Sequence, residues 1–406
     1  MFTSRQIFPD TKLASLPNWL TLSYTLFLAG FFCIANAVDL YKFYLVALLL
    51  PGILIAGNTL WSLRKSALLY AILLYVGYMF MTSLWSIDFS PTELKRTFWI
   101  SISIIMFSLI TVHLRHHYSN TYDGILKTTC FLTAIAAITS MVAWYSKNPF
   151  PSSRMGGISF MDNPNSIAFA YGFFTLLSSH YALKSETLRG RSLFISISIV
   201  LMVSVLLTQS RAGALATVAA VAVLCIHMLG RKSITLIITI FGALATATYL
   251  VAPSDLVSQQ IHRGLPERPG IWKTVAEQVS NAPIFGNGFQ KELLVDEQGY
   301  VSIANYAHNA MLATARDGGF VGLSLHLAIL IIALSRAIQV DNNSMSSFYL
   351  SALLFGFIVM TFDKDQLIDR PRELWLFFWL PLAILLAEDF DTESDDAGHF
   401  NQRGLQ

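Results

Sequence analysis

Apolar runs long enough to cross a bilayer follow one another along most of this chain, and they constrain its fold more than any other feature. A spanning helix needs roughly 20 mostly apolar residues. Only 13% of the 406 residues are charged, against roughly 25% in an ordinary soluble domain. The candidate spans are 18–38, 41–58, 66–86, 97–112, 125–145, 163–183, 192–209, 211–229, 234–252, 318–339, 346–362 and 373–388. The sequence therefore predicts an all-α polytopic membrane protein with about twelve spans, or as few as ten because some runs are short.

Basic residues in the short turns set the expected orientation. Twelve spans place both chain ends on one side, with the turns that contain Arg64-Lys65, Arg115, Arg231-Lys232 and Arg336. Cytoplasmic loops carry an excess of Lys and Arg, so we take this side as cytoplasmic and the opposite side as periplasmic. The net charge of +2 includes no basic stripe, which argues against a nucleic-acid partner.

The chain is expected to divide into four parts around one long polar loop. Spans 1–9 occupy 1–252, the loop occupies 253–309, spans 10–12 occupy 310–388, and an acidic cytoplasmic tail occupies 389–406. Loops of this length in compact proteins are usually functional or disordered. We predict that this loop is periplasmic and contains amphipathic helices, and that the acidic tail is disordered.

One helix is expected inside the loop. Ile271, Trp272, Val275 and Val279 have helical spacing, and Pro269 suits the first turn. We predict that this helix lies along the membrane surface, with Trp272 facing the core or the interface.

Two arginines on the predicted periplasmic side are candidate phosphate ligands. Ser210 and Arg211 stand where two apolar runs meet with almost no loop, and Arg268 stands at the start of the loop helix. A helix N-terminus attracts anions, and a guanidinium can hold two phosphate oxygens at once. Taken singly, each arginine is equally explained as a surface or interface residue.

A histidine just before the tenth span is the candidate acid–base group. His308 has a side chain whose ordinary pKa suits proton transfer near neutral pH. Asn309 follows it and can orient a substrate or cap the next helix. Asn165, at the start of the sixth span, has the same two readings. The alternative for His308 is an interface residue without chemistry.

The last outer loop is strongly charged. Asp363-Lys364-Asp365 has the Asp-x-Asp form of metal-dependent glycosyltransferases, a pattern that is also common by chance, and Arg370 and Arg372 follow it. We predict that Asp363, Arg370 and Arg372 contact a substrate and that no metal is bound.

Taken together, these residues resemble the O-antigen ligase family, polytopic enzymes that join O-antigen to lipid A–core. The resemblance is carried by three blocks in the order and spacing of the family. They are Leu207-Thr208-Gln209-Ser210-Arg211-Ala212-Gly213, then Arg268 with Ile271-Trp272, Pro283 and Gly286-Asn287-Gly288-Phe289, then His308-Asn309 with Gly318-Gly319 and Gly322. The specific part covers about 205–325.

The resemblance implies a GT-C-like membrane glycosyltransferase of a Gram-negative inner membrane. Its donor is an undecaprenyl-diphosphate glycan and its acceptor is a sugar hydroxyl on lipid A–core at the periplasmic face, with no cofactor. By position, Arg211 and Arg268 hold the donor diphosphate and His308 activates the acceptor hydroxyl. Direct attack opposite the diphosphate inverts the anomeric centre.

Three other functions stay open on the sequence alone. An O-antigen polymerase and a protein O-oligosaccharyltransferase share the Arg and His pattern but use other acceptors. A transporter or lipid flippase is a different class, and such proteins place ionisable groups near mid-membrane. Here the spans have almost no central charges, with His326 the main exception, so chemistry at one membrane face is favoured.

Overall fold

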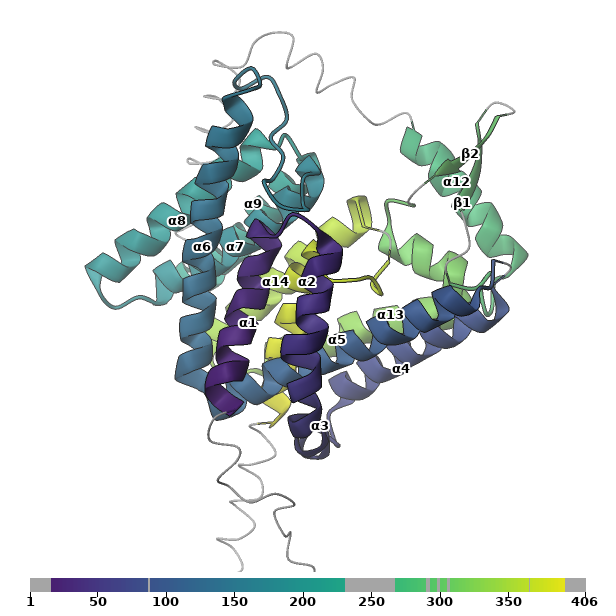
Figure 1. The fold of residues 1–406 in the computed structure, drawn as a ribbon, viewed down its shortest axis with the longest axis horizontal. Helices are drawn as coiled ribbons and strands as arrows, with labels where there is room; N and C mark the ends of the chain where they lie inside the picture. The colour runs from purple at the N-terminus through teal and green to yellow at the C-terminus, as the bar shows by residue number, and fades with distance from the viewer. Residues whose placement is uncertain are drawn as a thin grey trace, which may run out of the picture.

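The computed structural model describes residues 16–86, 88–230, 267–289, 293–297, 300–304, 307–364 and 366–390 (Figure 1). The first elements are α1 (Leu16–Cys33), α2 (Ala37–Tyr44), the π-helix η1 (Leu45–Leu49), α3 (Leu50–Ser62), α4 (Ala67–Thr82), η2 (Ser83–Trp85), α5 (Pro91–His117) and α6 (Ser119–Tyr145). They are followed by α7 (Pro164–Lys184), α8 (Leu188–Leu207), α9 (Arg211–Leu229), α12 (Glu267–Asn281), β1 (Leu293–Glu297), β2 (Tyr300–Ala304), α13 (Ala310–Gln339) and α14 (Asn343–Phe362). A last helix covers 373–390 and includes the π-helical turn η3 (Trp375–Trp379).

The helical, multi-span architecture is confirmed for the described part of the chain. Eight of its helices are long and apolar enough to cross a membrane. Several spans that look short in sequence belong to longer helices, because polar ends extend them: 97–112 lies within the 27 residues of α5. The predicted ninth span, 234–252, and the tail after residue 390 lie outside the described residues.

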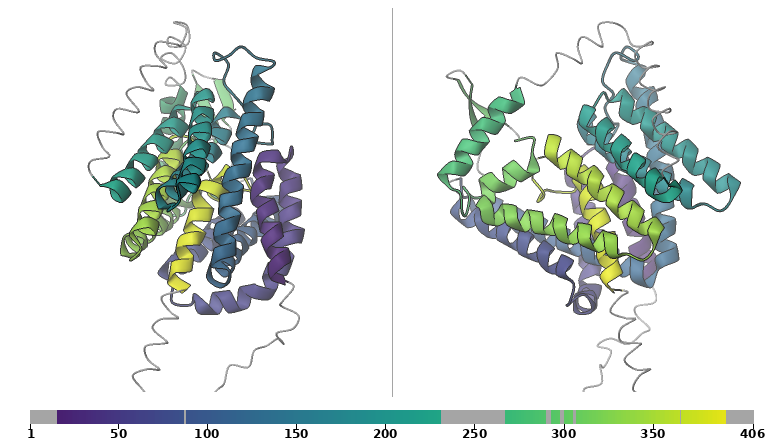
Figure 2. Two further views of the ribbon diagram at one scale, coloured as in Figure 1. Left: turned by 90° about the vertical axis from the view of Figure 1, so that its left-hand side faces the viewer. Right: turned by 180° about the vertical axis from the view of Figure 1, so that it is seen from behind.

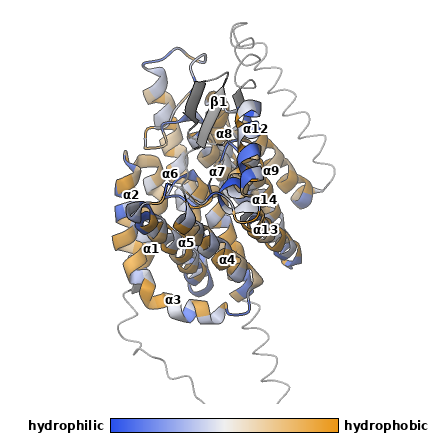
Figure 3. Cartoon of the chain, turned by 90° about the vertical axis from the view of Figure 1, so that its right-hand side faces the viewer, coloured by the Kyte–Doolittle hydropathy of each residue, from blue (hydrophilic) through white to orange (hydrophobic). Residues whose placement is uncertain are grey.

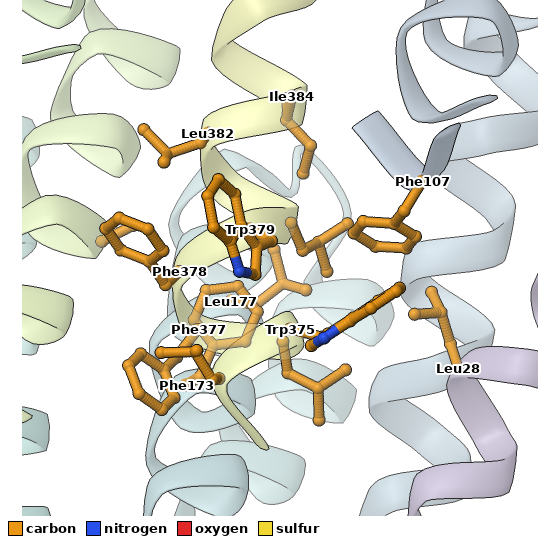
Figure 4. Close-up of a cluster of buried hydrophobic side chains, with 14 of the residues drawn as sticks. Leu28, Phe107, Phe173, Leu177, Trp375, Phe377, Phe378, Trp379, Leu382 and Ile384 are labelled. Carbon is orange, nitrogen blue, oxygen red and sulfur yellow. The ribbon is translucent and has the colours of Figure 1, made fainter. Parts of the chain in front are cut away.

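The last helix forms the centre of the hydrophobic core. Nearly every side chain from 374 to 387 is buried, and the views in Figure 2 show this helix, in yellow, among the others. Trp375 packs against Phe27, Tyr44 and Phe107 with ring centroids 5.1–6.0 Å apart (Figure 4). A helix that is apolar all round is stable only when other helices enclose it, and this one is so enclosed.

A kink in α13 is built from glycines and from the turn that follows α12. Gly319 has φ +61° inside the helix, and a Cβ there would lie 2.2 Å from the carbonyl oxygen of Ile284. The backbone N–H of Phe320 donates to the carbonyl of Pro283, and that of Gly288 donates to the carbonyl of Asp317. The turn thus supplies hydrogen bonds that the broken helix lacks. It fixes the 282–289 segment beside α4, which packs along α13 (Figure 1).

The predicted loop helix exists as α12, and its apolar face has a protein partner. Val275 is buried against Ala307 and Ala313 at the start of α13, with Ile271 partly buried beside it. The indole N–H of Trp272 donates to the carbonyl of Ala307 at 2.9 Å. In Figure 3, hydrophilic colouring is visible on part of α12. The helix therefore docks on α13 through the face that carries Trp272, which we expected to face the core or the interface.

A short antiparallel hairpin, β1–β2, follows α12, with Val295 opposite Ser302. The sequence analysis predicted only helices in this loop, because five-residue strands give too short a pattern to read. The hairpin adds a small β element to a fold that is otherwise helical in its described part.

Candidate functional site

The turn between α8 and α9 presents Arg211 at the first residue of α9. Gln209 has φ +54°, a left-handed conformation that allows the sharp turn. The Ser210 hydroxyl accepts a hydrogen bond from the N–H of Gly213 at 3.3 Å and so caps α9. The side chain of Arg211 is exposed. Ser210 is therefore used for capping, while Arg211 stands beside the positive end of the helix dipole.

A segment that precedes α7 covers this turn. The Gln209 side-chain amide donates to the carbonyl of Pro151 at 3.0 Å. Arg154 donates to the carbonyl of Thr208 at 3.1 Å and to the Asn165 side-chain oxygen at 2.7 Å. Asn165 is thus held beside the turn of Arg211. The sequence analysis did not single out Arg154, because its role depends on a contact with residues 54 positions away.

Three of the predicted site residues meet at the other side of the same region. The Asp363 carboxylate oxygen Oδ1 lies 3.1 Å from Nδ1 of His308 and 3.6 Å from Nη2 of Arg268. Arg268 also donates from Nη1 to the carbonyl of Phe362 at 2.5 Å. Asp363 therefore joins the start of α12, the start of α13 and the end of α14. We call Arg268, His308 and Asp363 the loop-end cluster.

The backbone fixes the position of His308. Its φ is +53°, which is uncommon for a residue other than glycine. Asn309 then caps α13 by accepting hydrogen bonds from the N–H groups of Met311 and Leu312, both at 3.0 Å. The side chain of Asn309 is thus committed to the helix start. His308 is held at a defined angle to Asp363 by a strained residue and a tight cap.

The three side chains of the loop-end cluster differ in their solvent exposure. The side chain of Asp363 is 7% exposed, whereas those of His308 and Arg268 are 33% and 31% exposed. A buried carboxylate requires charged or hydrogen-bonding partners, and here it has the guanidinium of Arg268 and a ring nitrogen of His308. Its anionic charge therefore serves to hold the imidazole and the guanidinium, both of which retain solvent access.

This geometry argues against the hypothesis that Asp363 is a metal ligand. Its carboxylate is engaged by two groups that are themselves cations or can become so, and such a partner set repels a divalent ion. Among the residues that the structure describes, no group of three or more His, Cys, Asp or Glu side chains has the arrangement of a metal site. Asp365 lies outside the described residues.

Helix α7 brings the turn of Arg211 and the loop-end cluster into one region. A Cβ added to Gly213 would lie 2.8 Å from the Cβ of Ala168, so the start of α9 is packed closely against α7. At the next residue, the Phe169 ring lies 5.7 Å from the ammonium of Lys364. Gly213 and Lys364 thus lie against neighbouring positions of α7. Gly213 is two residues after Arg211, and Lys364 follows Asp363 directly.

The remaining loop arginines, Arg370 and Arg372, lie farther along the 363–372 segment. Arg372 Nε is 3.9 Å from the Asp369 carboxylate, and the backbone N–H of Arg370 donates to that carboxylate at 2.7 Å. Burial raises the pKa of Asp369, and the charge of Arg372 opposes this effect. The side chain of Arg370 instead lines a groove beside α5.

The fold and this site define a class: a multi-span helical membrane protein whose Arg, His and Asp side chains gather at one end of its helices. A family model described as O-antigen ligase matches residues 196–327. The chain is also 27% identical over 388 residues to an O-antigen ligase of Pseudomonas aeruginosa, across 92% of this chain and 91% of that protein. These matches confirm the resemblance to the O-antigen ligase family. Asp363 and Arg370 lie beyond the segment that the family model matches.

Proposed function

We propose that the chain is an O-antigen ligase of a Gram-negative inner membrane. It transfers a glycan from undecaprenyl diphosphate to a sugar hydroxyl of lipid A–core at the periplasmic face. The proposal is supported by the two family matches. The observation that carries it is the convergence of Arg268 and His308 on Asp363, since a guanidinium that can bind phosphate then lies near an imidazole that can accept a proton.

His308 acts as the general base in this proposal. Asp363 accepts from Nδ1–H, which selects the tautomer with a basic Nε2 and stabilises the imidazolium that forms. The acceptor hydroxyl gives its proton to Nε2 as its oxygen bonds to the anomeric carbon. A positioned base of this kind contributes about 10²–10⁴-fold to the rate.

Arg211 and Arg268 stabilise the leaving group. The bond from the anomeric carbon to the diphosphate oxygen breaks, and its electron pair leaves with undecaprenyl diphosphate. Removing one fixed donor to such a developing charge costs about 10²–10³-fold in rate. Arg268 has five N–H donors and uses part of them on Phe362 and Asp363, so others can reach a phosphate oxygen. Attack on the face opposite the diphosphate inverts the anomeric centre.

Two arginines replace a divalent metal in this mechanism. Each carries a permanent positive charge and a planar fork that fits phosphate oxygens. Because Asp363 is engaged by Arg268 and His308, the Asp-x-Asp motif serves the protein rather than an ion.

The test begins with deletion of the gene in its host. We expect bare lipid A–core on a lipopolysaccharide gel, together with long glycan that accumulates on undecaprenyl diphosphate. Core capped by a single repeat unit would instead identify a polymerase. An unchanged lipopolysaccharide profile would contradict both, and it would direct attention to a protein O-oligosaccharyltransferase or a transporter.

A further inference from the structure

A groove of about 410 Å³ lies between η1, the starts of α3 and α5, and Arg370 of the last loop. One wall is apolar, and it includes Val46, which is 66% exposed, and Trp99, which is 43% exposed. The other wall carries Lys95, Arg96 and Arg370. The groove therefore joins a hydrocarbon-like surface to a group of cations.

The shape of the apolar wall follows from the sequence. Pro51 begins α3 and has no N–H to donate to the preceding turn. The N–H of Leu50 donates instead to the carbonyl of Leu45, five residues back, which produces the wider π-helical turn η1. Such bulges inside helices are frequent at functional sites.

The cations of the groove exceed its anions. Glu93 pairs with Arg96 at 2.9 Å, and the described residues that line the groove include Lys95 and Arg370 but no carboxylate. The Nε atoms of both Arg96 and Arg370 are buried without a hydrogen-bond partner in the part of the chain that the structure describes. The excess of positive charge therefore favours an anionic group in the groove.

The apolar wall and the cationic wall together indicate which kind of anion fits the groove. A free anion gains nothing from the exposed aliphatic and indole surface. A zwitterionic lipid carries a cationic group of its own, which Lys95, Arg96 and Arg370 would repel. A phosphate-bearing lipid satisfies both walls, since arginine forks bind phosphate oxygens and acyl chains cover the apolar side. We propose that this groove binds the phosphorylated head group of the acceptor lipid, with an acyl chain along η1.

The groove and the loop-end cluster share one rigid segment. Asp363 and Arg370 are seven residues apart, so their Cα atoms lie within about 25 Å. Lys364 pairs with Glu373 across this segment, and the indole N–H groups of Trp375 and Trp379 donate to the carbonyls of Asp369 and Leu367 at 3.0 and 2.9 Å. That reach suits a glycosylated lipid whose phosphate rests in the groove while its sugar extends to His308. The acceptor role rests on the proposed function, whereas the lipid-phosphate site does not.

Binding is tested on the full-length protein in detergent. Lipids with brominated acyl chains quench tryptophan by contact, and the difference between wild type and Trp99→Phe isolates the signal of Trp99. We expect brominated phosphatidic acid to quench this signal at concentrations at least tenfold lower than brominated phosphatidylcholine. Equal quenching by the two lipids would overturn the proposal. So would displacement of phosphatidic acid by millimolar inorganic phosphate, because the site would then bind a simple anion.

Variants localise the effect. Lys95→Gln combined with Arg370→Gln is expected to weaken phosphatidic acid binding about tenfold or more. Lys42→Gln is the matched control, because Lys42 lies on neighbouring α2 and pairs with Asp39 at the surface. Equal loss in the control would show only a general surface charge effect and would refute the site.

A transfer assay separates this proposal from the function on which it rests. We expect Arg370→Gln to raise KM for lipid A–core about tenfold and to leave KM for the lipid-linked donor unchanged. A wild-type protein that transfers nothing would refute the proposed function, while the quenching result would still decide the lipid-phosphate site. Active protein with an unchanged acceptor KM in Arg370→Gln would refute the acceptor role alone.

Discussion

Two groups of partly buried charges lie at opposite ends of the helices, and they are balanced differently. At one end, which we call the tail-end network, Arg115 pairs with Glu388 and Arg336 pairs with Asp389. Tyr349 donates to Glu388 at 2.6 Å, and Ser66 donates to Asp389. In the loop-end cluster one carboxylate, Asp363, serves both Arg268 and His308.

Exposure separates the two groups further. The four charged side chains of the tail-end network are 14–23% exposed, whereas Arg268 and His308 are about one-third exposed. A network with one carboxylate for each cation is electrostatically complete and ties helices together. In the loop-end cluster one carboxylate is shared between a guanidinium and an imidazole, and both of these groups stay accessible to a substrate. The comparison teaches that exposure and the sharing of one carboxylate, more than charge content, distinguish the structural end from the candidate reactive end.

The strongest test of this contrast is removal of the base. We expect His308→Ala to lower glycan transfer by about 10²–10⁴-fold because proton transfer is lost. Transfer by purified protein measures this, with membrane insertion checked in parallel. His227→Ala, at the exposed C-terminal turn of α9, is the control and is expected to stay active. Full activity in His308→Ala would remove this residue from the mechanism.

The next effect concerns the leaving group. Arg268→Ala and Arg211→Ala are each expected to lower kcat by about 10²–10³-fold, since each removes a donor to the developing diphosphate charge. Arg268→Lys should recover only part of the rate, because an ammonium lacks the planar fork. Single-turnover kinetics with the lipid-linked donor measure the loss. A change confined to KM would mean that the arginine binds the donor without assisting its departure.

A pair of matched substitutions breaks the comparison directly. Asp363→Asn is expected to lower transfer by about 10–100-fold with little change in thermal stability, because it releases His308 and Arg268. Asp389→Asn is expected to keep transfer while destabilising the protein by about 1–3 kcal/mol, because it leaves the partly buried Arg336 without its carboxylate. Activity and melting temperature are measured for both variants. The reverse pattern would contradict the assignment of the two ends.

The smallest expected effect is that of metal removal. Chelators should leave transfer unchanged, because Arg211 and Arg268 supply the positive charge and Asp363 is occupied by protein groups. Transfer is measured after dialysis against a chelator and again after Mg²⁺ or Mn²⁺ is added. Loss of activity followed by rescue with a divalent ion would restore Asp363 as a candidate metal ligand.

The sequence was sufficient for features that depend on local pattern. Apolar length predicted the spanning helices, and the spacing of Trp272, Val275 and Val279 predicted α12. Helix-start chemistry also gave the cap at Asn309 as one of its two readings, whereas the cap at Ser210 was not predicted. These features are readable because each depends on neighbouring residues.

Features that depend on distant contacts were beyond the sequence. Asp363 was predicted to contact a substrate, but its partners His308 and Arg268 lie 55 and 95 positions away in the chain. Arg154 had no signal at all. The adjacent residues Arg316 and Asp317 form a fully buried pair at 2.6 Å inside α13, just before the expected span 318–339. Tertiary packing decides such pairs, because only the fold shows which charges lose contact with water.

The central position of the last helix has a consequence for how the protein is made. Chains emerge from the ribosome in order, and earlier segments begin to fold first. The helix at 373–390 therefore reaches the membrane after every other described helix, although it fills the middle of the bundle. The earlier helices must leave room for it, and the side chains around Trp375 can close only when it arrives. The central helix is thus the last described helix to join the bundle, and the loop that carries Asp363 takes its position in that same step.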